Sequence, residues 1–323
     1  MANQKFSSNE LFGIGSNVKV WEVGDLSNPF VPEKDEGYQF REESLQPVLY
    51  WMHMNRTVGD KDSLFLTGPT GSGKSSLILQ VAARLGIPVQ RVNGHRYLEV
   101  MDLYGRMSII GGDTMFIDGP LTTAYKEGHL FLLDEIDLIN PGTNAGLNTV
   151  LDYAPITIAE DGGVVIPPAP GFGFIATGNS AGNGDELGAY TGTTVQNGAF
   201  MDRFMVVNVD YPSPETEVGI INNLVPGLPQ SVVEGLVNVA NRIRELYLTG
   251  TTSMAGGPSA SIEVTMSTRT LLRWAKMVLM QHQAKFSDGV ARHTLRHALS
   301  NRASKSTSEA IDMIANLVLG DGL

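Results

Sequence analysis

A glycine-rich segment near residue 70 has the residue types and the spacing that phosphate binding requires. It is Gly68-Pro69-Thr70-Gly71-Ser72-Gly73-Lys74-Ser75, between an apolar stretch and a segment of helical periodicity. Glycines let backbone N–H groups approach phosphate oxygens, and the N-terminus of the following helix adds a favourable dipole. Lys74 can reach the β- and γ-phosphates of a nucleotide, and the Ser75 hydroxyl can ligate Mg²⁺. With Ser76, the segment therefore predicts a nucleotide site that uses Mg²⁺.

Two adjacent carboxylates, Asp134 and Glu135, follow the apolar run that begins at His129. At the carboxyl end of a strand beside a phosphate-binding loop, Asp134 can hold Mg²⁺ through water, and Glu135 can polarise an attacking water. Taken alone, a strand followed by a solvated acidic turn explains the same residues. The glycine-rich loop favours the metal and water roles.

Two further polar residues are candidates for the same chemistry. Asn179 follows the apolar segment 172–177 and Gly178. At that position the amide of Asn179 could hydrogen-bond a γ-phosphate or the lytic water. Arg203 precedes another apolar segment and could act as an arginine finger, which places positive charge against a phosphoryl transition state. The alternatives are a turn role for Asn179 and a helix-end ion pair of Arg203 with Asp202.

The elements that must position these residues alternate between strand and helix patterns. The predicted strands are 63–67, 88–93, 129–134, 172–177 and 205–209, and the predicted helices among and before them are 44–56, 75–85 and 144–153. Strands with continuous apolar centres, separated by helices, predict an α/β fold with a parallel sheet covered on both faces.

Two segments interrupt this alternation, and a different pattern follows it. Residues 106–118, around Gly111-Gly112, and 156–167, around Gly162-Gly163, have the pattern of β-hairpins that project from the core. After residue 212 only helices are predicted, at 215–224, 231–247, 268–285, 290–299 and 307–319, with a polar loop at 249–261. We expect an N-terminal arm (1–43) without a helix, an α/β core (44–212) and a helical domain (213–323).

Composition excludes several classes of protein. The 323 residues contain no cysteine, which excludes disulfides, thiolate catalysis and Cys-ligated metal sites. The net charge of −11 opposes broad adsorption to nucleic acid or anionic lipid. No apolar run approaches the ~20 residues that cross a bilayer. The sequence therefore predicts a cytoplasmic protein with no membrane association.

A basic segment, 285–305, opposes the overall acidic charge and contains His293 and His297, four residues apart. Two histidines at this spacing could bind a metal ion, but no third ligand is evident. We interpret the segment as a solvated or subunit-facing helix surface.

These motifs resemble those of AAA+ ATPases, and within them the MoxR-type branch. The strings that carry this resemblance are Asp102-Leu-Tyr-Gly-Arg106, Gly119-Pro120-Leu121, Leu133-Asp-Glu-Ile-Asp137 and 144–152. The chain is also similar to the CobS family, the ATPase subunits of aerobic cobaltochelatase. That likeness rests on Phe12-Gly-Ile-Gly-Ser-Asn-Val-Lys-Val20, Ala176-Thr-Gly-Asn179, Gly184-Asp-Glu-Leu-Gly-Ala-Tyr190, Gly192-Thr193, Met201-Asp-Arg203 and Met266-Ser-Thr-Arg269, and it spans 11–274.

The resemblance implies a role for each matching residue. Lys74 and Ser75 would belong to Walker A, and Asp134 and Glu135 to Walker B, with ATP and Mg²⁺ as cofactors. The remaining implied residues are Asn179 as sensor 1, Arg203 as a finger on a neighbouring subunit's ATP, Arg269 as sensor 2 on a helical lid, and Asn93 as a restraint on the catalytic glutamate.

The resemblance also implies an assembly and a function. It predicts a hexameric ring whose pore is lined by the two hairpins, and an ATPase that remodels or activates a protein partner. That partner would carry a von Willebrand factor A domain and support metal insertion. Two alternatives stay open: a nucleic-acid motor, which the basic segment 285–305 would serve, and a ring scaffold without catalysis.

Overall fold

The computed structural model describes residues 5–14, 20–59, 61–182, 184, 192–249, 262–284 and 289–320. Contacts divide the chain into two units: Met1–Glu36, Phe40–Pro69 and Gly73–Asp210 form the first, and Gly37–Gln39, Thr70–Ser72 and Tyr211–Leu323 form the second. Parts of the predicted motifs lie outside the described residues, namely 15–19 and 185–190 of the family strings, 250–261 of the polar loop, and 285–288 of the basic segment.

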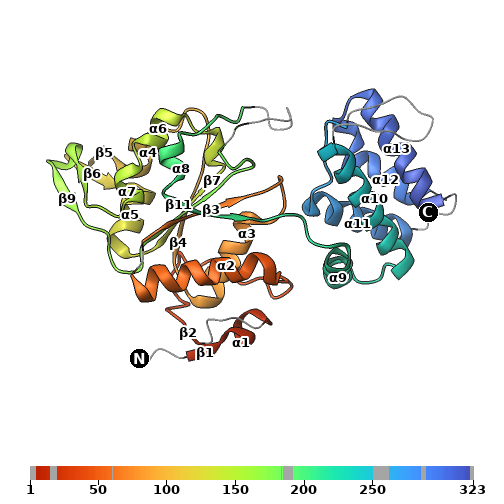
Figure 1. Cartoon of the computed structure of the whole chain (residues 1–323), viewed down its shortest axis with the longest axis horizontal. Helices are drawn as coiled ribbons and strands as arrows, with labels where there is room; N and C mark the ends of the chain where they lie inside the picture. The colour runs from red at the N-terminus through yellow and green to blue at the C-terminus, as the bar shows by residue number, and fades with distance from the viewer. Residues whose placement is uncertain are drawn as a thin grey trace. The chain divides into compact units, whose positions relative to one another are not determined.

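A five-stranded parallel sheet is the centre of the first unit (Figure 1). Its strands, in spatial order, are β11 (Phe204–Asn208), β3 (Ser63–Thr67), β10 (Gly173–Thr177), β7 (Leu130–Asp134) and β4 (Val89–Asn93). Each lies within one residue of its predicted range. The carboxyl ends of β3, β4, β7 and β10 therefore meet at one edge, where ligands bind in open α/β sheets.

Alternate side chains of the strands enter two separate cores, one on each face of the sheet. Leu64, Leu132 and Ile175 pack with buried residues of α2 (Glu42–His53) and α3 (Lys74–Leu85). On the other face, Phe65, Phe131 and Phe174 pack with α5 (Pro120–Glu127) and α7 (Asn148–Leu151). Figure 1 shows these helices on opposite sides of the strands. The predicted αβα fold is confirmed.

Both predicted hairpins are present. β5 (Gly105–Ile110) pairs antiparallel with β6 (Asp113–Asp118), after the short α4 (Val100–Tyr104), and β8 (Ile156–Ile158) pairs with β9 (Val164–Ile166). Gly111 and Gly112 have φ of 64° and 99°, so the tight turn uses a left-handed conformation that glycine allows.

The prediction of one helix over 144–153 is wrong, because two short helices, α6 (Pro141–Ala145) and α7, take its place. Gly146 interrupts them and packs so closely on Val100 that a Cβ there would lie 2.7 Å from Val100 Cγ2. Glycine also weakens a helix interior by about 1 kcal/mol relative to alanine. The break between α6 and α7 therefore has both a local cause and a packing cause. A further short helix, α8 (Gly198–Met201), precedes β11.

The N-terminal segment contains a helix, although the sequence predicted an arm without one. β1 (Lys5–Ser7) pairs antiparallel with β2 (Val20–Glu22), and α1 (Ser8–Phe12) begins with a capping box between Ser7 and Glu10. Phe12 and Trp21 are buried in the same core as α2 and α3. The capping box explains how so short a helix begins. Polar residues interrupt the apolar periodicity of this segment, so its sequence did not predict a helix.

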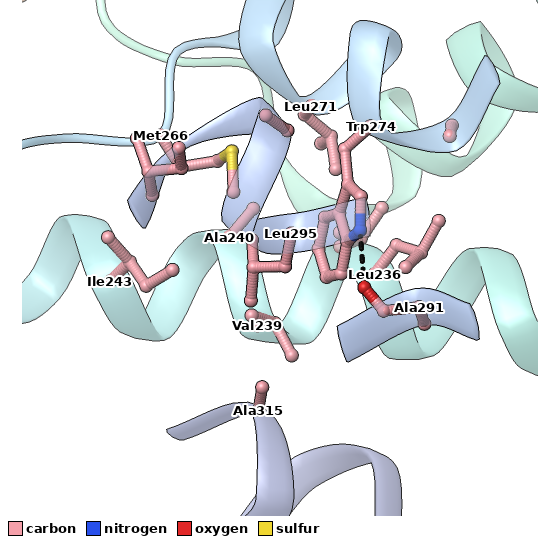
Figure 2. Close-up of a cluster of buried hydrophobic side chains, with 14 of the residues drawn as sticks. Leu236, Val239, Ala240, Ile243, Met266, Leu271, Trp274, Ala291, Leu295 and Ala315 are labelled. Atoms are coloured by element: carbon pink, nitrogen blue, oxygen red, sulfur yellow. Dashed lines mark hydrogen bonds between the residues drawn. The ribbon is translucent and has the colours of Figure 1, made fainter. Parts of the chain in front are cut away.

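The second unit is helical in its described part, as predicted. Its helices are α9 (Pro214–Leu224), α10 (Gln230–Thr249), α11 (Thr268–Gln283), α12 (Val290–Ala298) and α13 (Lys305–Leu319). They enclose one core around Trp274, whose indole N–H donates to the carbonyl of Ala291 at 2.8 Å (Figure 2). A buried ion pair between Arg244 and Glu217, at 2.7 Å, joins α10 to α9. Within the described chain, no helix is both long and apolar enough to span a membrane.

Candidate nucleotide site

The glycine-rich loop connects the end of β3 to the start of α3. Gly68, Gly71 and Gly73 have φ of 139°, 71° and 100°, which side chains rarely adopt. A Cβ on Gly68 would lie 2.3 Å from the carbonyl oxygen of Val209, whereas one on Gly73 would meet nothing within 4 Å. Gly73 is also the N-cap of α3, and no side chain caps this helix there. The loop thus leaves the N-terminus of a 12-residue helix open to an anion.

Lys74 is buried, and its ammonium group lies within the loop. Its Nζ donates to the carbonyls of Gly68 and Pro69, at 2.7 and 3.0 Å, and to Oδ1 of Asn179 at 3.1 Å. Burial lowers the pKa of Lys74 to about 8, although Asp137, Glu135 and Asp134 oppose the shift. Within the described residues, the hydrogen bonds of Lys74 Nζ go to neutral oxygens. A buried cation in such surroundings suits an anionic ligand, so the loop fits the phosphates of a nucleotide.

Asp134, at the end of β7, is the acceptor for several side chains. Ser75 Oγ and Thr177 Oγ1 donate to Oδ1 at 2.5 and 3.0 Å, and Arg91 Nε donates to Oδ2 at 2.6 Å. A serine hydroxyl and a carboxylate oxygen are the hard ligands that Mg²⁺ takes alongside nucleotide phosphates. Ser75 and Asp134 therefore fit the predicted metal site.

Glu135 has φ of 56°, the left-handed conformation that is uncommon outside glycine. Its N–H donates to Thr177 Oγ1 at 3.1 Å. Asn93 is the cross-strand partner of Asp134, and Gly94 N–H donates to the Asp134 carbonyl at 2.6 Å. The turn that carries Glu135 is thus held from two neighbouring strands, as is typical of strained backbone at functional sites.

Asp137 and Thr177 lie in this site, but the sequence assigned them no role. Asp137 is fully buried, and Oδ2 accepts the backbone N–H of Asn179 at 2.6 Å. Desolvation raises the pKa of Asp137, and hydrogen bonds from Asn179 and Ser180 oppose that rise. The only sequence clue was their position inside two family strings. Asp137 fixes the backbone from which the Asn179 side chain reaches Lys74.

Arg203 lies at the amino ends of the parallel strands, opposite the end that carries the glycine-rich loop. Its carbonyl accepts the N–H of Ser63, the first residue of β3, whereas the glycine-rich loop follows the last. A five-residue strand spans roughly 13 Å, so Arg203 is well separated from the loop of its own chain. Arg203 forms an ion pair with Asp152, at 2.7 Å, whereas the alternative drawn from the sequence was an ion pair with Asp202.

Two other predicted residues are exposed on helices. Arg269 is exposed in the first turn of α11, in the second unit. Ser76 is exposed on α3. Among the described residues, no three His, Asp or Glu side chains gather around a possible metal ion. His293 and His297 form an edge-on ring pair on α12, with centroids 5.1 Å apart.

A glycine loop before a helix, with Lys74, Ser75 and Asp134 at the carboxyl edge of a parallel sheet, defines a P-loop nucleotide-binding protein. Residues 63–204 match the AAA domain (dynein-related subfamily), and residues 217–318 match the CbbQ/NirQ/NorQ C-terminal family. The chain belongs to the MoxR-type AAA+ ATPases, together with proteins named CobS and NorQ.

Two relatives and one solved structure illustrate the similarity. The chain is 33% identical over 281 residues to the aerobic cobaltochelatase subunit CobS of a Sinorhizobium species, covering 84% of this chain and 79% of that protein. It is 36% identical over 236 residues to NorQ of Paracoccus denitrificans, covering 72% and 78%. A RuvB mutant of Thermotoga maritima has a TM-score of 0.52 at 14% identity, covering 83% of this chain and 73% of that one, which shows a common fold.

Proposed function

We propose that the chain binds ATP with Mg²⁺ and hydrolyses the ATP, as part of a ring that remodels or activates a protein partner. The observation that carries the proposal is the meeting of Lys74, Ser75, Asp134 and Asn179 at one edge of the sheet. Membership in the AAA+ ATPases supports nucleotide binding by this edge.

Each residue of the edge has a distinct task in this proposal. The ammonium of Lys74 and the backbone N–H groups of the loop bind phosphate oxygens. Ser75 and Asp134 hold Mg²⁺, which neutralises developing phosphoryl charge when it is bound. Glu135 accepts the proton of the attacking water, and Asn179 orients that water or the γ-phosphate.

The test is ATP turnover by Glu135→Gln, which keeps the size of the side chain and removes the base. We expect turnover to fall about 10² to 10⁴-fold while ATP binding persists, since a general base contributes about that much. Glu127→Gln is the matched control, because Glu127 is an exposed glutamate at the end of α5. Equal turnover in Glu135→Gln and wild type would instead support a ring scaffold without catalysis.

The proposal extends to the assembly. Arg203 would act on the nucleotide of a neighbouring subunit, as its place at the opposite edge of the sheet favours. We propose a hexameric ring of such subunits, with Arg269 as sensor 2 and Asn93 as the restraint on Glu135. The functional parts would be an arm (1–43), an ATPase core (44–212) and a lid (213–323).

The partner is proposed from the relatives and from the hairpins. CobS is by name a subunit of a cobaltochelatase, which supports a partner that takes part in metal insertion. From the resemblance to that family, we further propose that this partner carries a von Willebrand factor A domain. Met107, Ile109 and Met115 on the hairpin β5–β6 are exposed, and such apolar side chains favour contact with a protein. The likeness to RuvB concerns the fold and does not favour a nucleic-acid substrate.

A further inference from the structure

Arg91 makes a contact with the proposed metal site that no sequence motif predicted. Its side chain lies on β4, two residues before Asn93, and Nε donates to Asp134 Oδ2 at 2.6 Å. The other carboxylate oxygen, Oδ1, accepts Ser75 Oγ and Thr177 Oγ1. Asp134 therefore has a cation on one side and two hydroxyl groups on the other.

The strand register explains how Arg91 reaches this position. Arg91 is the cross-strand partner of Leu132, and Asn93 is that of Asp134, in the parallel pair of β4 and β7. Residues two apart on a strand share a face, so Arg91 and Asp134 lie diagonally on the same face. A long arginine side chain spans that diagonal.

Burial makes this contact important for the charge of the site. The Asp134 side chain is 5% exposed, whereas that of Arg91 is 47% exposed. A buried carboxylate requires a compensating charge, and Arg91 supplies it together with a directed hydrogen bond. A divalent cation binding at the same carboxylate would meet a charge that is already balanced.

We propose that Arg91 is a positioning residue of the cation site, which turns Oδ1 of Asp134 toward Ser75 and neutralises the carboxylate so that a bare divalent cation binds weakly. Cation binding then requires the additional negative charge of nucleotide phosphates. The proposal rests on the proposed ATP·Mg²⁺ site. It explains why a cationic side chain lies against a residue that would hold a metal ion.

The test measures Mn²⁺ binding to metal-stripped full-length protein without nucleotide, from the EPR signal of free Mn²⁺. Arg91→Gln should bind Mn²⁺ about tenfold more tightly than wild type, equivalent to about 1.4 kcal/mol. Arg91→Lys keeps the charge and should stay within about twofold of wild type. Arg242→Gln is the matched control, because Arg242 is 46% exposed and pairs with Glu245 at 2.6 Å.

A second measurement ties the effect to Asp134. In an Asp134→Asn background, Arg91→Gln should leave Mn²⁺ affinity unchanged, because the cation and the arginine would compete for the same carboxylate. Unchanged affinity in the single variant, or a gain that persists without Asp134, would overturn the proposal. Arg91→Met removes the same charge, so either folded variant suffices, as monitored by thermal unfolding. If the wild type did not hydrolyse ATP, the proposed function would be refuted. The Mn²⁺ affinities would still test the role of Arg91, because they are measured without nucleotide.

Discussion

Lys74 is a buried ammonium group whose hydrogen bonds go to the carbonyls of Gly68 and Pro69 and the amide of Asn179. Because burial lowers its pKa to about 8, the group begins to lose its proton near that pH. Phosphate oxygens favour the charged form, so they raise the pKa in the nucleotide complex. Affinity for ATP should be full below pH 8 and fall by up to about tenfold per pH unit above it.

Calorimetric titration of ATP from pH 6.5 to 9.5, in EDTA and in two buffers of different ionisation enthalpy, measures this dependence. Above pH 8, wild type should take up a proton as it binds. Lys74→Arg is the control, because a guanidinium stays charged throughout this range and should abolish the slope. The same slope in both proteins would assign the pH dependence to another group.

Among the individual residues of the site, the sequence predicted those that lie within local motifs. Lys74, Ser75 and Asp134 follow from the glycine spacing and from a strand that ends in carboxylates, and the structure brings them together. Arg91 could not be found in this way, because its contact with Asp134 depends on the register of two strands that are 37 residues apart at their closest ends. Asp137 was hidden for a similar reason, since its partners are backbone N–H groups of another strand's end.

The hairpin β5–β6 is the element that we expect to contact a partner. Its pairing places Met107 and Phe116 on one face and Ser108 and Met115 on the other, so exposed apolar side chains lie on both faces. Ile109→Ser should reduce the ATPase stimulation by a partner at least about threefold, since the side chain is 76% exposed and available for burial.

Stimulation is measured with purified products of neighbouring genes and is expressed relative to the basal turnover of each variant. Leu317→Ser is the matched control, because Leu317 is 78% exposed on α13, outside the hairpins. Equal loss in both variants would indicate a general effect on the surface. An unaffected Ile109→Ser would place the partner elsewhere.

Elements with strong periodicity or continuous apolar centres were predictable, and short ones were not. The strands of the sheet and the helices of the second unit match their predicted ranges within about two residues, since tertiary packing reinforces their local patterns. The break between α6 and α7 depends on the contact of Gly146 with Val100, and α1 depends on a capping box and on burial of Phe12. These contacts come from distant parts of the chain or from few residues.

Arg203 and Glu135 lie on opposite sides of the proposed subunit interface, and this permits a test with two inactive variants. Glu135→Gln retains its finger, and Arg203→Ala retains its nucleotide site. Mixing them in equal amounts before assembly should restore about a quarter of wild-type turnover, because that fraction of random neighbours combines an intact site with an intact finger.

The matched control mixes Glu135→Gln with Lys74→Ala. Both changes affect the same side of the interface, so no pairing completes a site and turnover should stay at the level of the parents. If Glu135→Gln and Arg203→Ala also fail to complement, Arg203 does not act between subunits. Light scattering on each mixture reports whether the variants assemble.

Arg203 is held by its ion pair with Asp152 and lies at the opposite end of β3 from the glycine-rich loop. This separation determines how many working sites an assembly contains. If Arg203 completes a neighbour's site, each chain carries two unlike halves and no whole site. The number of working sites then equals the number of junctions between chains. A closed ring has as many working sites as chains, an open arc has one fewer site than chains, and a lone chain has none. Turnover per chain would measure how many rings are closed.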